Sequence, residues 1–254
     1  MIYKSLKIGY RLFIKSTKSE YSNMAFGYFW NFAEPITLTV IFAILRSGNI
    51  INASVNDYPF FLYLLTGLFP FQLFFTHIQR TTNSIEANSD LLNQINLSPL
   101  SIIFTNYFHW LFDSLFVALV ISISCLIFSP NNILYLPIAF ILLQLFGLLA
   151  IGIGLIAAPI NTVYKDTSKI ISLTLRPLMF ASPIFYLSYD SPLLNQFNQF
   201  NPIAMFLTNY RAMTLDINLF NWKIFLLFLT ICGASILGGI WFFSKALPCL
   251  NTKS

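Results

Sequence analysis

Between Ser114 and Tyr164 the chain carries no charged residue over 51 consecutive positions. An apolar helix crosses the hydrocarbon core of a bilayer with about 20 residues, so this stretch is too long for one crossing and suits two. Near its middle, Ser129-Pro130-Asn131-Asn132 is typical of a tight turn. We therefore predict a pair of membrane-spanning helices joined by a short connection.

The composition of the whole chain also indicates that its main solvent is lipid. Charged residues make up 9% and hydrophobic residues 57%, whereas soluble domains carry about 25% charged residues. These values exclude a secreted disulfide scaffold, a disordered tail and an ordinary cytosolic enzyme. Cys125, Cys232 and Cys249 form no C-x-x-C pair and lie at no metal-ligand spacing from His77 or His109, so we expect neither a disulfide framework nor a metal site.

Six apolar runs, separated by charged or polar segments, predict six transmembrane helices. Each is predicted to be helical because lipid leaves an isolated apolar run no other way to satisfy its backbone hydrogen bonds, and none shows the alternation of barrel strands. The expected fold is an all-α integral membrane protein with a transmembrane domain over residues 28–243 and a tail over 244–254. The predicted spans are 28–45, 58–76, 102–128, 133–158, 170–187 and 224–243.

The distribution of Lys and Arg predicts the orientation. With six spans, residues 1–29, the segments after spans two and four, and the tail share one side of the membrane and hold ten Lys and Arg. The other side holds three, namely Arg46, Arg211 and Lys223. Because Lys and Arg concentrate on the cytoplasmic side, we expect both termini in the cytoplasm. The net charge of +5 then reflects membrane topology rather than nucleic-acid binding.

Residues 1–27 predict an amphipathic helix at the membrane surface rather than a cleaved signal peptide. Its cations recur every three or four residues and form one stripe, with Ile2, Leu6, Tyr10 and Phe13 opposite. Such a helix would offer its cations to lipid phosphates, although simple anchoring by positive charge accounts for the pattern equally well. The stripe is Lys4, Lys7, Arg11, Lys15 and Lys18.

Catalytic motifs are absent from the sequence. There is no G-x-x-x-x-G-K-[ST], H-E-x-x-H or G-x-S-x-G, so the chain is not predicted to hydrolyse ATP by itself or to act as an enzyme. The acidic and basic residues within the apolar runs are Glu34, Asp113 and Arg176, fewer than a proton-coupled carrier usually shows. We expect Asp113 to face protein and Arg176 to reach toward lipid phosphates. Arg176-Pro177 is expected to break or kink the fifth span, with a second irregularity at Pro183.

Five motifs, in order over residues 27–211, together resemble the ABC-2-type permeases that export O-antigen, capsule and teichoic-acid polysaccharides. The C-terminal segment Ala246-Leu247-Pro248-Cys249-Leu250-Asn251 departs from the charged helical tail common in that family. The motifs are Gly27-Tyr28-Phe29-Trp30 with Glu34-Pro35; Tyr58-Pro59-Phe60-Phe61-Leu62 with Thr66-Gly67-Leu68-Phe69-Pro70-Phe71; Asn83-Ser84-Ile85-Glu86-Ala87-Asn88 with Leu91-Leu92 and Ser98-Pro99-Leu100; Tyr164-Lys165-Asp166 with Ala181-Ser182-Pro183-Ile184-Phe185-Tyr186; and Asn201-Pro202-Ile203 with Tyr210-Arg211.

The resemblance implies a working arrangement. Two copies of the chain would pair, each with a separate ATPase subunit, and a lipid-linked glycan would pass between them without any cofactor. The segment from Arg80 to Pro99 would include a coupling helix that docks on the ATPase, and residues 188–223 would form re-entrant helices at the external face. A solvated loop with one helical turn is the alternative interpretation of this segment. Its candidate contact residues are Asn83, Ser84, Glu86, Asn88 and Asp90.

Aromatic residues are candidates for lining a glycan conduit, since sugar C–H faces stack on aromatic rings, although Phe also suits lipid and Tyr and Trp form interface belts. Arg211 could contact phosphate or an acidic sugar, or pair with Asp216 or Asp190. Glu34 could pair with a cation or face an aqueous entrance. The channel candidates are Tyr28, Trp30, Glu34, Tyr63, Tyr186, Tyr210 and Arg211.

Three other functions remain open from the sequence. An ABC-2 permease for drugs or small lipids would share the span count, and an ATP-independent carrier or channel would share the composition. A membrane-embedded transferase would need a catalytic constellation that the sequence lacks. The leading hypothesis is a multi-pass permease of the bacterial cytoplasmic membrane that exports a lipid-linked glycan and binds no nucleic acid.

Overall fold

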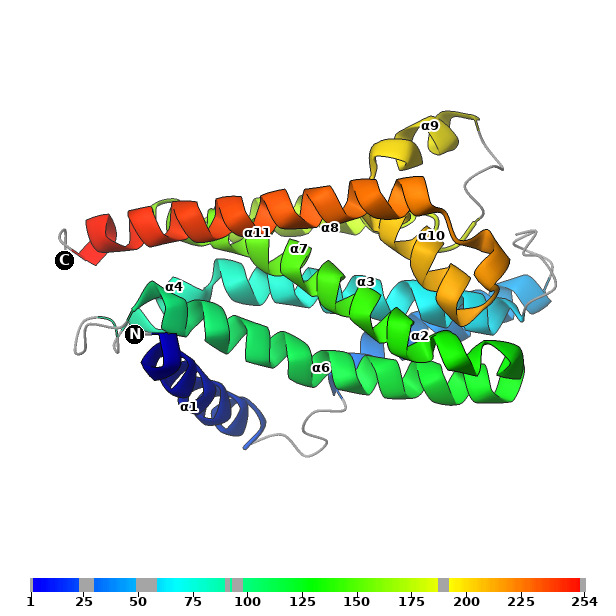
Figure 1. Cartoon of the computed structure of the whole chain (residues 1–254), viewed down its shortest axis with the longest axis horizontal. Helices are drawn as coiled ribbons and strands as arrows, with labels where there is room; N and C mark the ends of the chain where they lie inside the picture. The colour runs from blue at the N-terminus through cyan, green and yellow to red at the C-terminus, as the bar shows by residue number, and fades with distance from the viewer. Residues whose placement is uncertain are drawn as a thin grey trace.

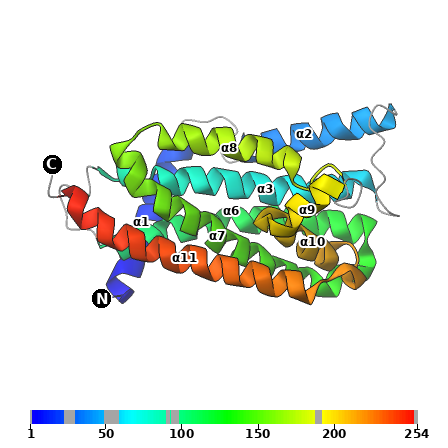
Figure 2. The same ribbon diagram turned by 90° about the horizontal axis from the view of Figure 1, so that it is seen from above.

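The computed structural model describes residues 2–22, 30–48, 59–89, 92, 98–186 and 192–251, and every regular element among them is helical (Figures 1 and 2). The chain is therefore an all-α protein in its described part, as predicted. In chain order the helices are α1 (Ile2–Tyr21), α2 (Trp30–Ser47), α3 (Phe60–Thr82), α4 (Ser84–Ala87), α6 (Pro99–Phe128), the 3₁₀ helix η2 (Pro130–Tyr135), α7 (Leu136–Val163), α8 (Thr167–Ala181), α9 (Pro192–Phe200), α10 (Pro202–Thr214), the 3₁₀ helix η4 (Ile217–Leu219) and α11 (Trp222–Asn251).

Four helical stretches in the described part of the chain are long and apolar enough to cross a membrane. They are α3, α6, η2 with α7 over Pro130–Val163, and α11 over Trp222–Leu247, and they match predicted spans two, three, four and six. Helices α2 and α8 occupy predicted spans one and five, but α8 has 15 residues and ends at Ala181. At about 1.5 Å per residue it is shorter than a hydrocarbon core of about 30 Å. The six-span count therefore stays a prediction.

Helix α3 forms the centre of the bundle. It packs against α2, α6, α7 and α8, and α11 covers the far side of α7. Figure 2 shows α8 and α2 along one edge and α11 along the opposite edge. Both termini lie at one end with α4, whereas α9 and α10 lie at the other end (Figure 1).

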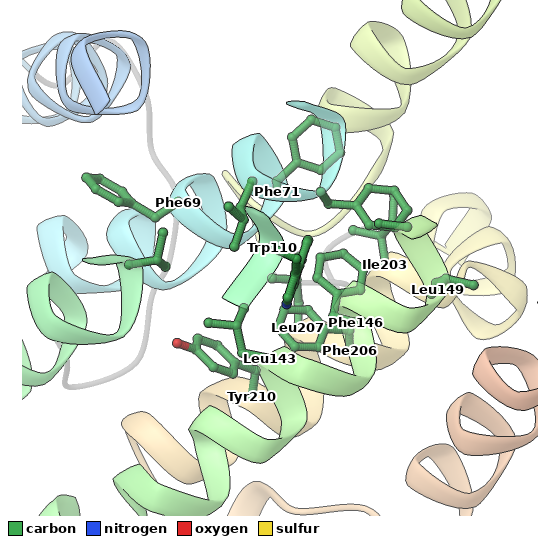
Figure 3. Packing of buried hydrophobic residues seen from close by; sticks show 14 of the residues in the cluster. Phe69, Phe71, Trp110, Leu143, Phe146, Leu149, Ile203, Phe206, Leu207 and Tyr210 are labelled. Atoms are coloured by element: carbon green, nitrogen blue, oxygen red, sulfur yellow. The ribbon is translucent and has the colours of Figure 1, made fainter. Parts of the chain in front are cut away.

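Aromatic rings from three helices stack through the core. Phe146 of α7 lies between Phe74 of α3 and Phe206 of α10, with ring centroids 4.3 and 4.0 Å apart and planes within 7° of parallel. Trp110 of α6 meets Phe146 edge-on (Figure 3). Such pairs contribute about 0.5–1.5 kcal/mol each beyond the area that they bury. The stack fixes α10 against the spans.

Glycines allow the closest helix approaches. A Cβ atom on Gly147 would lie 2.2 Å from the Trp110 ring, so only a glycine leaves room for this fully buried indole. Where α7 crosses α11, a Cβ on Gly239 would lie 2.6 Å from the Gly152 carbonyl oxygen, and Ser235 Oγ donates to the Leu149 carbonyl at 3.3 Å. Small residues at helix crossings are the usual means of close packing in lipid.

The prolines do not all interrupt the helices as expected. Helix α8 continues through Pro177, so a break there is wrong, and the chain leaves the helix at Ser182, just before Pro183, as predicted. Helix α11 likewise includes Pro248 and reaches Asn251, so the predicted tail is helical up to this residue rather than broken. Neighbouring helices and local adjustments can compensate for the hydrogen bond that a proline removes from a membrane helix.

Candidate functional site

The predicted coupling segment forms a short polar turn where α3 ends. Asn83, between α3 and α4, donates through Nδ2 to the Gln79 carbonyl at 3.0 Å. Its Oδ1 accepts from Asn161 Nδ2 at 3.0 Å, and Asn161 Oδ1 accepts from the Ser168 backbone N–H at 3.0 Å. This chain of amides, which we call the asparagine strap (Asn83, Asn161 and Ser168), fastens the α3–α4 turn to α7 and α8.

Beside the asparagine strap, two charged segments are exposed: α4, and the turn between α7 and α8 with the start of α8. Glu86 of α4 lies 3.4 Å from Lys165, in the turn between α7 and α8, with half or more of each side chain exposed. Asp166 in the same turn pairs with Lys169 at 3.3 Å. Exposed pairs of this kind are worth about 0–1 kcal/mol, so these groups can exchange partners at little cost. We call Glu86, Lys165, Asp166 and Lys169 the coupling surface.

The five predicted coupling residues differ in their accessibility. Glu86 is exposed, and Asn88 is partly exposed while its Nδ2 donates to the Ser84 carbonyl at 2.7 Å. Asn83 is engaged in the strap, and Ser84 is buried. Asp90 lies outside the described residues. The sequence did not show that the 164–166 turn lies beside α4, because these segments are about 80 positions apart.

The predicted N-terminal helix exists, and all five cations of its stripe are exposed. Small residues make its closest contacts with α6, beside the rings of Tyr10 and Phe13, which pack on Phe108. Gly9 lies so close to α6 that a Cβ would be 2.7 Å from Phe104 Cβ, and Ser5 Oγ is 2.7 Å from Ser98 Oγ. Tyr10 remains about half exposed, so α1 keeps an apolar surface as well as its cations. Arg176, the other predicted head-group residue, is exposed on α8.

A polar cluster that the sequence analysis missed joins α1, α3 and α6. Arg80 donates to both oxygens of Glu20 at 3.0 Å, and its Nη1 lies 3.4 Å from His109 Nδ1. His109 Nε2 in turn is 2.8 Å from Ser16 Oγ. We call these four residues the α1 lock. Two-point contact between guanidinium and carboxylate is strong and directional, so it fixes the position of α1 on the last turns of α3.

A buried pair lies one turn earlier in α3. His77 Nε2 is 2.8 Å from Asp113 Oδ2, and both side chains are almost fully buried. Asp113 therefore faces protein, as predicted, and its partner comes from α3. A buried carboxylate needs such a partner because desolvation of an isolated charge is unfavourable.

Arg211 forms the most enclosed polar contact of the predicted channel group. It is buried, donates to the carbonyl oxygens of Tyr63 at 3.1 Å and Ile184 at 3.3 Å and to that of Pro183, and lies 3.5 Å from the Tyr63 ring centroid. Asp216 instead accepts from the Asn218 backbone N–H. We call this contact the Arg211 clamp; it joins α10 to α3 and to the segment that follows α8. An ion pair with Asp216 is not formed, and Asp190 lies outside the described residues.

The remaining channel candidates divide by exposure. Tyr210 is buried and stacks on Phe206. Tyr186 is partly buried, and its hydroxyl donates to the Ala181 carbonyl and accepts from Asn198 Nδ2 at 3.2 Å. Trp30 is 57% exposed. The two residues not yet placed are Glu34, which is exposed and accepts from Gln72 Nε2 at 2.8 Å, and Tyr28, which lies outside the described residues.

Comparison with known proteins identifies relatives over most of the chain, although no family model matches it. The polysialic acid transport protein KpsM of Escherichia coli is 28% identical over 188 residues, which are 71% of this chain and 70% of the relative. The O-antigen export system permease protein RfbA of Myxococcus xanthus is 27% identical over 218 residues, 83% of this chain and 80% of the relative. The capsule polysaccharide export inner-membrane protein BexB of Haemophilus influenzae is 28% identical over 191 residues, 71% and 68% of the two chains. The predicted resemblance is confirmed: over more than two thirds of its length, this all-α membrane protein is similar to bacterial polysaccharide-export permeases.

Proposed function

We propose that the chain is the membrane-spanning permease subunit of an ATP-driven exporter of a lipid-linked polysaccharide. The observation that carries this proposal is the match to export permeases over more than two thirds of both chains. The sequence holds no P-loop, so ATP would be hydrolysed by a separate subunit. The four long apolar helices agree with a location in the cytoplasmic membrane.

The proposed assembly contains two copies of the chain and two ATPase subunits. The coupling surface lies at the end where both termini lie, and the distribution of Lys and Arg favours the cytoplasm for that end. An ATPase could therefore reach Glu86 and Lys165 from the cytoplasm. Reporter fusions at the two termini and at Asn218 test this orientation: all three reporters on one side would contradict it.

The asparagine strap suggests how docking would act on the membrane helices. A displacement of the exposed turn at Glu86 would pass through Asn83 and Asn161 to α7 and α8 as well as to α3. Polar amides suit this task because they form several hydrogen bonds without carrying a charge into the bilayer. Asn88 and Asp90 would extend the docking surface.

The head-group and channel roles follow from exposure. The cations of α1 would lie at the cytoplasmic membrane surface near the phosphate of the lipid carrier. Trp30 and Glu34 in the first turns of α2 are the favoured contacts for glycan, together with Tyr28, which precedes them in the chain, and with Tyr186. Tyr63, Tyr210 and Arg211 are enclosed by the chain and would support the conduit rather than touch its content.

The main experiment is deletion of the chain, followed by localisation of the glycan. Accumulation of lipid-linked polymer in the cytoplasm is expected. Normal surface display would defeat the proposal. Co-purification of an ATPase distinguishes the proposal from an ATP-independent carrier, and export of polymer rather than of drugs or small lipids distinguishes it from the related permease function.

Coupling is tested by Glu86→Ala and Asn88→Ala, which are expected to lower glycan export per ATP hydrolysed while leaving the amount of folded protein unchanged. Asn218→Ala, an exposed substitution at the opposite end, is the matched control. Asn83→Ala should instead reduce the folded yield, because it leaves the Asn161 amide without its acceptor. Unchanged coupling in both α4 variants would refute the role of this surface.

A further inference from the structure

An apolar cavity lies between α7, α10, η4 and the first turns of α11, at the end away from the termini. Its volume is about 460 Å³, within the range of ligand pockets. Its lining consists of apolar and aromatic side chains, among them Ile138, Leu142, Met213, Phe220 and Phe225. Neither the coupling surface nor the channel candidates contribute to it.

The cavity opens on the outer surface of two helices that are candidate membrane spans. Ile138 and Ile141 form its lip on α7 and are 45% and 59% exposed, and the facing wall is the start of α11. Both helices are long and apolar enough to span the membrane. A ligand that enters here would come sideways from the bilayer, so a hydrocarbon chain fits the lining and the route of entry.

The end of the cavity at the start of α11 suits a phosphate. Trp222 is 69% exposed and is held by edge contacts with Phe220 at 4.9 Å and Phe225 at 6.1 Å. Trp residues prefer the level of the lipid head groups, so this rim marks the membrane interface. The exposed Lys223 follows directly, and it forms no ion pair with a carboxylate in the described part of the chain.

The nearby carboxylate does not neutralise this cation. Asp216 accepts from the Asn218 backbone N–H at 3.0 Å and so caps η4. The rim residue Trp222 is therefore an exposed indole, and it is followed in the chain by a lysine that pairs with no carboxylate among the described residues. An amphiphile with an anionic head and a hydrocarbon tail matches this lysine and the apolar cavity.

We propose that this cavity binds one acyl chain of a membrane phospholipid, with the lipid phosphate at Lys223. The site is separate from the proposed path of the glycan and does not depend on which cargo the chain exports. Its occupant is an ordinary phospholipid of the bilayer and not the lipid carrier of the cargo. By filling the space between α7, α10 and α11, the acyl chain would stabilise the contact of α10 with the spans.

The test uses the full-length protein in detergent, titrated with phosphatidylglycerol and followed by native mass spectrometry. The wild-type chain should retain one lipid that survives mild delipidation. Ile138→Trp should abolish this retained lipid by filling the cavity, whereas Ile160→Trp should keep it. Ile160 is the matched control because it is a similarly exposed isoleucine on α7 (40%) that does not line the cavity.

The head-group half of the proposal has its own measurement. Lys223→Gln should weaken retention of phosphatidylglycerol but leave that of diacylglycerol, which lacks the phosphate, unchanged. Equal retention in Ile138→Trp and Ile160→Trp would overturn the site. Recovery of a polyprenyl phosphate instead of a phospholipid from the purified protein would overturn the assigned occupant.

Discussion

The crossing of α7 and α11 allows a sharp test of the packing, with a control one residue away. In Gly239→Ala the new methyl group would lie 2.6 Å from the Gly152 carbonyl oxygen, about 0.8 Å inside the 3.4 Å at which ordinary contact begins. The neighbour is backbone and cannot rotate away, so the two helices must separate. An opening of about 0.5–1 Å forfeits a quarter to a half of the dispersion energy of the affected contacts.

The expected loss in the free energy of unfolding is about 1–3 kcal/mol, the usual cost of overpacking. Lipid adds no hydrophobic force to hold the helices together, so little compensates for this loss. Gly238→Ala is the matched control, because a methyl group there meets no atom within 4 Å. The control should be neutral or stabilising by up to about 1 kcal/mol, since alanine favours the helix.

Unfolding by sodium dodecyl sulfate in mixed micelles, followed by tryptophan fluorescence, measures both variants. The midpoint for Gly239→Ala should fall clearly below that of the wild type, and that for Gly238→Ala should not. Equal midpoints for the two variants would refute the reasoning, because the helix-propensity change is the same in both.

Three further predictions concern the polar contacts and the buried indole. Glu20→Gln should loosen α1 by about 1 kcal/mol, since its pair with Arg80 is only partly buried, and faster hydrogen exchange in α1 amides would show it; exchange as slow as in the wild type would contradict the α1 lock. Arg211→Lys should lower the free energy of unfolding by about 2 kcal/mol, because one ammonium cannot replace a planar guanidinium that reaches several carbonyls. A midpoint of thermal unfolding equal to that of the wild type would argue against the clamp. Gly147→Ala should reduce the folded yield, and Trp110→Phe in the same chain should partly restore it; absence of rescue would exclude the ring clash as the cause.

The sequence predicted the elements well and their contact faces less well. The charge-free stretch became two apolar helices joined at Ser129–Tyr135, and the spacing of the N-terminal cations predicted α1. Helix α1 is predicted to rest its apolar stripe in the membrane interface, and two residues of that stripe, Tyr10 and Phe13, pack on Phe108 of α6. Its closest contacts with α6 come from Ser5 and Gly9, because close approach depends on the size of a side chain and not on its polarity.

The candidate site could be predicted only where one segment forms it. The exposure of Glu86 follows from a short polar turn, and this part of the prediction needed no tertiary information. The approach of Lys165 to it, the pairing of Glu20 with Arg80 and the contact of Arg211 with the Tyr63 carbonyl join positions 60 to about 150 residues apart. No local pattern encodes such distances, so the sequence left Arg211 with several possible partners.

The Arg211 clamp has a consequence for any motion of the outer end of the bundle. The Arg211 guanidinium contacts carbonyls from α3 and from the segment after α8, and it loses these acceptors if α10 moves alone. Gradual sliding or rotation of α10 would strand that charge among apolar side chains. The outer helices therefore either move together with α3 as one body, or release Arg211 completely and let water reach it.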